Sequence, residues 1–189
     1  GRFQDSWNDP EQLAVYLAQA INDEFFEESI PAAERLLTLD DSSRSSGLLA
    51  RTYSGAGRID AAERIVRDCL SRHGKSGAML ANLAHVQASR GEYGMAKATL
   101  LQALEIDPND DRAVCWYESA HRDQGGEAAG IAALSHLATL PGSWRAQLML
   151  GQHALHSQQP DRAFALFGEC IANTGRPAPM DVLADISAT

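Results

Sequence analysis

Residues 77–110, GAMLANLAHVQASRGEYGMAKATLLQALEIDPND, decide how the whole chain is interpreted. The first part has apolar residues at the spacing of one helical face, namely Leu80, Leu83, Ala84 and Val86. The second part has another such set, namely Met95, Ala96, Ala98, Leu100, Ala103 and Leu104. Arg90-Gly91-Glu92 separates the two helices, and Pro108 follows the second because proline cannot continue a helix. Two helices of this size cannot bury their apolar faces alone, so the stretch predicts further helices packed on either side.

The same pattern recurs along the chain. Residues 61–66 (AAERIV) repeat residues 32–37 (AAERLL) with two changes, and Gly57, Gly91 and Gly125 are spaced by 34 residues. We therefore expect residues 1–189 to form a single helical array. Its predicted parts are an irregular first pair (1–42), four regular pairs (43–76, 77–110, 111–143 and 144–176) and a terminal or truncated helix (177–189).

Local signals place the ends of the first two helices. Asp9 is a suitable N-cap, Pro10 suits the first helical position, and Gln12 has the spacing of a capping box. A second helix is predicted over 31–39, with Ser29 as its cap.

A period of 34 residues with a helix–turn–helix in each unit resembles the tetratricopeptide repeat (TPR). In residues 77–110, Leu80 stands at the family's tryptophan site and Leu83-Ala84 at its Leu-Gly pair, and the remaining sites match through Ala96, Leu100, Ala103 and Pro108. The resemblance covers about 43–176 and is weakest in the fourth pair, where Glu118 and Gly130 stand at normally small sites. It implies an all-α fold, an α-solenoid of about five antiparallel helix pairs plus a terminal helix in a right-handed superhelix.

Charge and composition narrow the classes of partner. The formal charge is −9, and residues 1–41 carry ten acidic against two basic side chains. Because no basic stripe is visible, nucleic acid is not expected as a partner. No apolar run approaches the roughly 20 residues that a membrane-spanning helix needs, so we expect no membrane insertion.

The cysteines and the N-terminus bear on the origin of the chain. Cys69, Cys115 and Cys170 are odd in number and widely spaced, which favours a reducing compartment and a cytoplasmic location. The first residues lack both an initiator Met and a signal-type apolar core, so we expect a processed form or a cloned fragment.

The resemblance also implies a function, a non-catalytic scaffold that binds a peptide segment of another protein in a concave groove lined by first helices. Five arginines stand among the groove sites, with Asp123 as the one acid nearby, so we expect an acidic segment or a C-terminal carboxylate as ligand. The alternative is that these arginines only form a solvated helix face. The groove sites that the resemblance implies are Arg44, Arg51, Asn82, His85, Arg112, Ser119, Arg122, Arg145 and Gln152.

Other classes of function are less well supported by the residues. His153 and His156 share a helix face, but no third metal ligand is evident, so we expect no metal, no cofactor and no enzymatic activity. Two alternatives stay open, a regulatory or assembly arm of a larger enzyme or secretion complex, and a homodimer formed through exposed end helices. Trp7 and Trp144 are the candidate contacts of such a homodimer.

Overall fold

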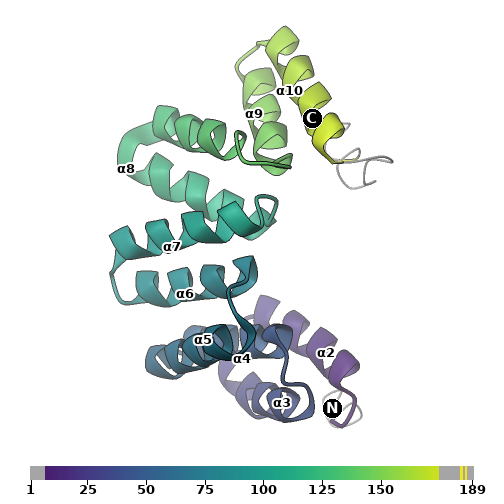
Figure 1. The fold of residues 1–189 in the computed structure, drawn as a ribbon, viewed down its shortest axis with the longest axis vertical. Coiled ribbons are helices and arrows are strands. Elements are labelled where there is room, and N and C mark those ends of the chain that lie inside the picture. The colour runs from purple at the N-terminus through teal and green to yellow at the C-terminus, as the bar shows by residue number, and fades with distance from the viewer. Residues whose placement is uncertain (1–6, 175–183, 185, 187–189) are drawn as a thin grey trace. The chain divides into compact units, whose positions relative to one another are not determined.

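The chain folds into antiparallel pairs of helices, which confirms the predicted all-α helical repeat. The structure, a computed structural model, describes residues 7–174, 184 and 186, and these residues contain helices but no strand (Figure 1). In chain order the helices are α2 (Pro10–Asn22), α3 (Phe26–Leu39), α4 (Ser43–Gly55), α5 (Ile59–His73), α6 (Gly77–Ser89), α7 (Tyr93–Ile106), α8 (Asp111–Leu137), α9 (Arg145–His156) and α10 (Pro160–Asn173). The fold is an α-solenoid in class, since successive pairs repeat one supersecondary unit.

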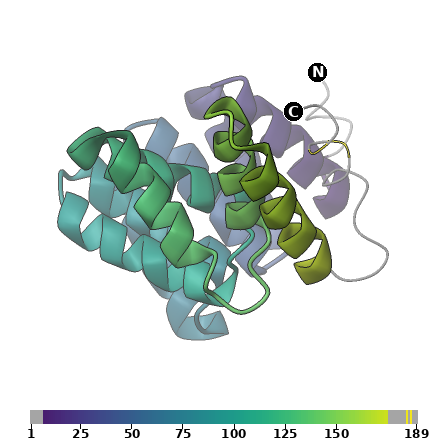
Figure 2. The ribbon, with the colours of Figure 1, turned by 90° about the horizontal axis from the view of Figure 1, so that it is seen from above.

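The helices divide into two compact units, Gly1–Thr99 and Leu100–Thr189, and α7 crosses the boundary. In the first unit, buried residues of α2, α3 and α4 form one core, and Ala50, Val66, Cys69 and Met79 form another between α4, α5 and α6. In the second unit, Phe167 and Cys170 of α10 pack with Leu148 of α9, and the two helices lie side by side (Figure 2). Each unit thus has its own apolar core.

The start of α2 agrees with the sequence prediction, whereas the start of α3 does not. Asp9 caps α2 by accepting hydrogen bonds from the backbone N–H groups of Glu11 and Gln12, both at 3.1 Å. The second helix ends at Leu39 as predicted, but its predicted start is wrong, because α3 begins at Phe26 and Ser29 lies buried inside it rather than capping it. The helix starts earlier because the ring of Phe26 packs into the space beside Gly55 of α4.

One predicted apolar stripe needs a correction. Ala96, Leu100, Ala103 and Leu104 of α7 are buried, as expected. Met95 is 54% exposed and Ala98 is also exposed, so neither belongs to the buried face. The stripe assigned from the sequence was too wide, because a hydrophobic residue next to the buried face of a helix still counts in an apolar pattern.

The turn within each pair places one residue in the left-handed backbone region. Gly57 and Gly91 have φ values of 73° and 78°, and in α8 the corresponding residue is Gly126 at 74°, although Gly125 is the glycine spaced by 34 residues from Gly91. Gly126 makes the bend that divides α8 into two helical halves. Glu24 and Gln158 occupy the same position in the turns after α2 and α9, although their side chains disfavour it.

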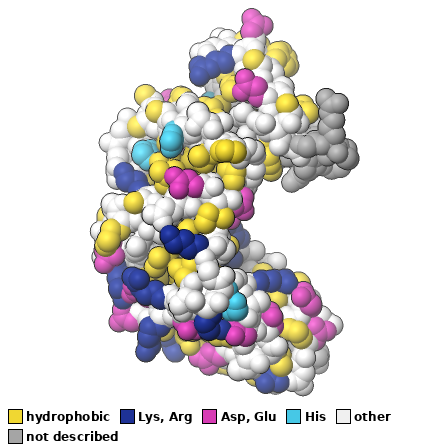
Figure 3. Space-filling view, in the orientation of Figure 1, with side chains coloured by type: hydrophobic (Ala, Val, Ile, Leu, Met, Phe, Trp, Pro, Cys, Tyr) yellow, Lys and Arg dark blue, Asp and Glu magenta, His cyan; other side chains and the backbone are white. Residues whose placement is uncertain are grey.

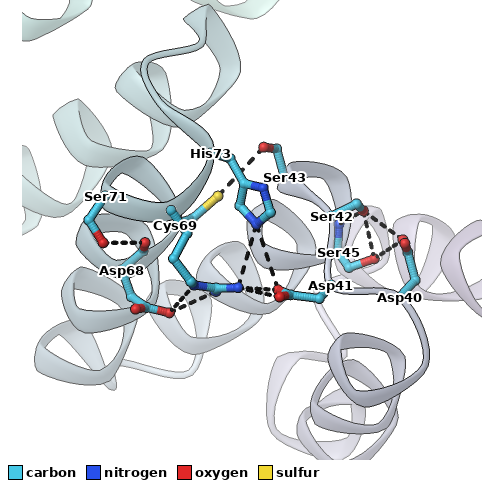
Figure 4. Close-up of polar contacts among 10 residues, drawn as sticks. Asp40, Asp41, Ser42, Ser43, Ser45, Asp68, Cys69, Ser71 and His73 are labelled. Carbon is cyan, nitrogen blue, oxygen red and sulfur yellow. Dashed lines mark hydrogen bonds and ion pairs between the residues drawn. The ribbon is translucent and has the colours of Figure 1, made fainter.

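A polar network joins the loop before α4 to the end of α5 (Figure 4). The Asp40 carboxylate accepts hydrogen bonds of 2.6 Å from the hydroxyls of Ser42 and Ser45, which lower its pKa. Next to it, Asp41 forms an ion pair with Arg72 of α5, and this hydrogen bond lowers the pKa of Asp41. These contacts hold the loop that follows the first helix pair against the second pair.

The predicted terminal helix (177–189) lies outside the described residues, apart from two positions. One of these, Ile186, packs against the core formed by α9 and α10.

Candidate functional site

All nine predicted groove residues lie on the first helix of a pair. In the first unit, Arg44 and Arg51 lie on α4, and Asn82 and His85 lie on α6. In the second unit, the first half of α8 carries Arg112, Ser119 and Arg122, and α9 carries Arg145 and Gln152. The structure therefore distributes these residues over two surfaces, one on each unit.

On the first unit, α4 and α6 adjoin directly. A Cβ added at Gly47 of α4 would lie only 3.2 Å from the side-chain nitrogen of Asn82 on α6. The absence of a side chain at Gly47 thus lets the two first helices approach, as helix packing at short interaxial distance requires. Arg51, Asn82 and His85 consequently belong to one continuous surface, which we call the α4–α6 face.

The titratable side chains of the α4–α6 face, Arg51 and His85, are basic. Desolvation by the surrounding protein lowers the pKa of His85, and the nearby positive charge of Arg51 lowers it further. Arg44 forms an ion pair of 2.9 Å with Glu11 of α2, but both side chains are more than half exposed. An exposed pair of this kind is worth at most about 1 kcal/mol, so a ligand could displace Glu11 at little cost.

On the second unit, the arginines have closer acidic partners than the sequence suggested. Arg122 donates to the carboxylate of Glu118 at 3.1 Å, one turn earlier in α8. Glu118 is buried, with only 4% of its surface exposed, and it accepts a further hydrogen bond of 3.4 Å from Ser119. The expectation that Asp123 is the one acid near the arginines is therefore wrong, and the i, i+4 spacing of Glu118 and Arg122 could have revealed the pair.

Arg145 is also held within the second unit. It forms an ion pair with Asp111 of α8, and its guanidinium lies 6.0 Å from the ring centroid of Trp144. The side chain of Asn109 accepts hydrogen bonds from the backbone N–H groups of Trp144 and Arg145. These contacts fix the start of α9 against the loop before α8, so Arg145 has a structural role as well as a place among the predicted groove residues.

The histidines and cysteines form no reactive cluster in the part of the chain that is described. His153 Nδ1 lies 3.9 Å from a carboxylate oxygen of Glu127, and His156 Nδ1 lies 2.8 Å from the carbonyl oxygen of Gln152. No group of three or more metal-ligating side chains occurs among the described residues. Cys170 is buried, and burial raises its pKa to about 11, which keeps the thiol protonated.

Within the described ranges, none of the helices combines the length and the apolar character that crossing a membrane demands.

The two tryptophans proposed as dimer contacts are half-buried in the chain's own cores. Trp7 packs against the core of α2, α3 and α4, and Trp144 packs against that of α9 and α10. Several apolar side chains that were not predicted as contacts are more exposed than these tryptophans. They are Val15, Phe25, Tyr93, Met95, Ile106, Phe164 and Ile171.

Comparison with known proteins agrees with this architecture. A family model described as "Tetratricopeptide repeat" matches residues 55–114. TTC0263, a thermophilic TPR protein of Thermus thermophilus, is similar with a TM-score of 0.57 and 15% identity over 95% of this chain and 97% of that one. A tetratricopeptide repeat protein of Parabacteroides merdae ATCC 43184 is similar with a TM-score of 0.58 and 14% identity over 98% of this chain and 72% of that one. At these identities the similarity shows the fold alone. No curated protein matches the sequence.

Proposed function

We propose that this chain, whose residues 55–114 match the tetratricopeptide repeat family, binds a segment of another protein on the first helices of its pairs. The repeat fold implies an interaction scaffold, and TPR repeats generally serve as interaction modules rather than as enzymes. The observation that supports the proposed surface is the position of all nine predicted residues on α4, α6, α8 and α9. We further propose a non-catalytic role for the chain.

The charges of the two units favour different contributions to binding. On the second unit, Arg122 already pairs with Glu118 and Arg145 already pairs with Asp111. On the first unit, the ion pair of Arg44 with Glu11 is exposed, and the positive charge of Arg51 acts on His85. We therefore place the acidic part of the ligand on the α4–α6 face, near Arg51, Asn82 and His85.

Reversal of one charge tests this assignment. The probe is a set of synthetic peptides of equal length whose net charge is varied, and their binding to the full chain is measured by fluorescence anisotropy. We expect the acidic peptides to bind best and Arg51→Glu to raise their Kd about tenfold or more, since a hydrogen bond to a charged group contributes roughly 1.5–3 kcal/mol. Arg112→Glu combined with Arg122→Glu should have a smaller effect.

Arg67→Glu is the matched control, because Arg67 is an exposed arginine on the second helix α5. If Arg51→Glu and Arg67→Glu weaken binding equally, only net charge matters and the α4–α6 face is not the site. Equal binding of acidic and neutral peptides would reject an acidic ligand but leave a peptide-binding role intact.

Three further observations support the other parts of the proposal. The acidic charge of the chain, −9, disfavours nucleic acid as a partner. The three cysteines are free thiols, which supports a cytoplasmic location. The exposed apolar residues of α10 favour self-association as an additional property.

A further inference from the structure

A small cavity of about 80 Å³ lies in the second unit, beside the turn between α9 and α10. It is lined by side chains of the second half of α8, of α9, and of the turn and the start of α10. None of the nine predicted groove residues is among them. In Figure 3, basic side chains (dark blue) lie at the surface near this turn, close to acidic and hydrophobic ones. The cavity is thus formed by other residues than the proposed peptide-binding surface.

The inner wall of the cavity is apolar. Ile131 of α8 and Leu150 and Ala154 of α9 contribute to it, and the two residues of α9 are buried. A cavity of roughly 150 Å³ with apolar walls holds a benzene molecule. At about half that volume, the present cavity suits an aliphatic group of about four carbon atoms.

The mouth of the cavity is polar. Ser157, Gln159 and Arg162 are exposed there, and His153 is partly exposed. The guanidinium of Arg162 donates a hydrogen bond of 3.3 Å to Oε1 of Gln159, which leaves most of its N–H groups for other acceptors.

The charge of Arg162 is not compensated in the way that other arginines of the second unit are. Arg122 and Arg145 each form an ion pair with an acid of α8. Arg162 forms no ion pair with any residue that the structure describes. A positive charge therefore stands at the mouth of an apolar cavity.

The acids near the cavity do not neutralise this charge. An oxygen of the Glu127 carboxylate lies 3.9 Å from Nδ1 of His153, and the Glu127 side chain is mostly exposed. Asp161 is exposed and points to a different side of α10 from Arg162, because adjacent helical residues are about 100° apart. The mouth is therefore suited to an anion.

The turn that carries the mouth residues is fixed by backbone hydrogen bonds. The N–H of Gln158 donates to the carbonyl of Leu155, and the N–H of Gln159 donates to that of Ala154, both at 2.9 Å. These bonds hold the start of α10 against the end of α9. The cavity is thus formed before a ligand arrives, which reduces the entropic cost of binding.

An apolar cavity with a guanidinium at its mouth is complementary to a molecule that is aliphatic at one end and a carboxylate at the other. We propose that this cavity binds a branched aliphatic carboxylate, with the alkyl group against Leu150 and Ala154 and the carboxylate at Arg162. A free short-chain acid and the C-terminal valine of a polypeptide share this chemistry. The site does not depend on the peptide-binding role of the α4–α6 face.

Titration of the full chain with isovalerate, followed by the NMR signals of its backbone amides, tests the site directly. We expect the signals of residues 150–162 to shift with a Kd on the order of 1 mM, which is within the limit for so small a ligand. Isovaleramide lacks the charge, and acetate lacks most of the alkyl group. Each should bind about tenfold more weakly or less, because each loses one of the two contacts.

Two substitutions at exposed positions address the two parts of the site. Arg162→Gln should raise the Kd of isovalerate about tenfold, since it removes the charged donor. Ser157→Phe should abolish binding by filling the mouth. Arg67→Gln, at an exposed arginine of α5, is the control and should leave the Kd unchanged. Thermal unfolding checks that each variant keeps the fold of the parent.

N-acetylvaline separates the two sources of the ligand, because it is isovalerate with an acetamido group next to the carboxylate. Binding at least as tight as that of isovalerate identifies a polypeptide C-terminus, and weaker binding identifies a free acid.

Three outcomes would overturn the proposal. They are an absence of shifts in residues 150–162 at 20-fold the expected Kd, equal binding of isovalerate and isovaleramide, and a Kd that neither Arg162→Gln nor Ser157→Phe changes. None of these outcomes bears on the acidic peptides expected at the α4–α6 face.

Discussion

The hairpin of α4 and α5 and the hairpin formed by the two halves of α8 solve the same packing problem in different ways. In the first, the small residues Ala50 and Ala62 are both buried where the helices approach. In the second, the equivalent positions two repeats later hold Glu118 and Gly130. At these positions the second half of α8 has no side chain, whereas the first half has a long, charged one.

The geometry shows why the exchange is tolerated. A Cβ added at Gly130 would lie 2.6 Å from Oε1 of Glu118, so the carboxylate occupies the space that an alanine would need. Arg122 then compensates the buried charge at 3.1 Å. A buried charge is acceptable when it is paired and hydrogen-bonded, and both conditions are met here. The repeat therefore constrains the combined volume of the two positions rather than each residue by itself.

A glutamate placed at the equivalent position of the α4–α5 hairpin should have the largest effect on stability. Ala50→Glu places a carboxylate against Ala62 with neither a glycine nor a positioned arginine to accommodate it. We expect a loss of about 3–5 kcal/mol in the free energy of unfolding, measured in urea, from the unpaired buried charge and the overpacking. Ala98→Glu, at an exposed position of α7, is the control and should stay within roughly 0.5 kcal/mol of the parent.

The effect of Gly130→Ala on stability should change sign with the residue at position 118. In the parent, Gly130→Ala gains about 1 kcal/mol of helix propensity but displaces the Glu118 carboxylate, which costs about 1–3 kcal/mol, so we expect a net loss. In a Glu118→Ala background the propensity gain remains, and of the two closest contacts only the one with Cβ of Arg122, at 3.2 Å, is left. The same change should then stabilise the chain by up to about 1 kcal/mol. Thermal unfolding of the four variants of this cycle would reveal any lack of coupling.

Substitutions in the turns between paired helices should change the stability least. Gln158 has a φ of 55°, whereas Gly57 and Gly126 hold the equivalent positions of the two compared hairpins. The left-handed conformation costs a non-glycine residue about 1–2 kcal/mol, and glycine loses roughly 0.5–1 kcal/mol through the entropy of the unfolded chain. We therefore expect Gln158→Gly to stabilise by about 0.5 kcal/mol and Gly57→Ala to destabilise. A calorimetric melting temperature that falls for Gln158→Gly would show that its side chain makes a compensating contact.

Single residues show where reasoning from sequence succeeded and where it failed. Asp9 and Pro10 specify the start of α2 because a cap acts on backbone groups only two or three residues away. Ser29 failed as a cap because the start of α3 depends on Phe26, which packs beside Gly55 of another helix. The partners of Arg44 and Arg145 were missed for the same reason, since Glu11 and Asp111 are 33 and 34 residues distant in the chain.

Local patterns were enough to identify the repeat, the pairing of the helices and most positions of the small and large apolar residues, because helix periodicity and turn chemistry involve neighbours in the chain. Packing alone revealed which arginines are already matched by acids, why a glutamate can replace a small residue at position 118, and that Phe164 and Ile171 of α10 are exposed. These properties depend on side chains that meet only after the helices have packed, and their volumes and charges are balanced between helices rather than within one.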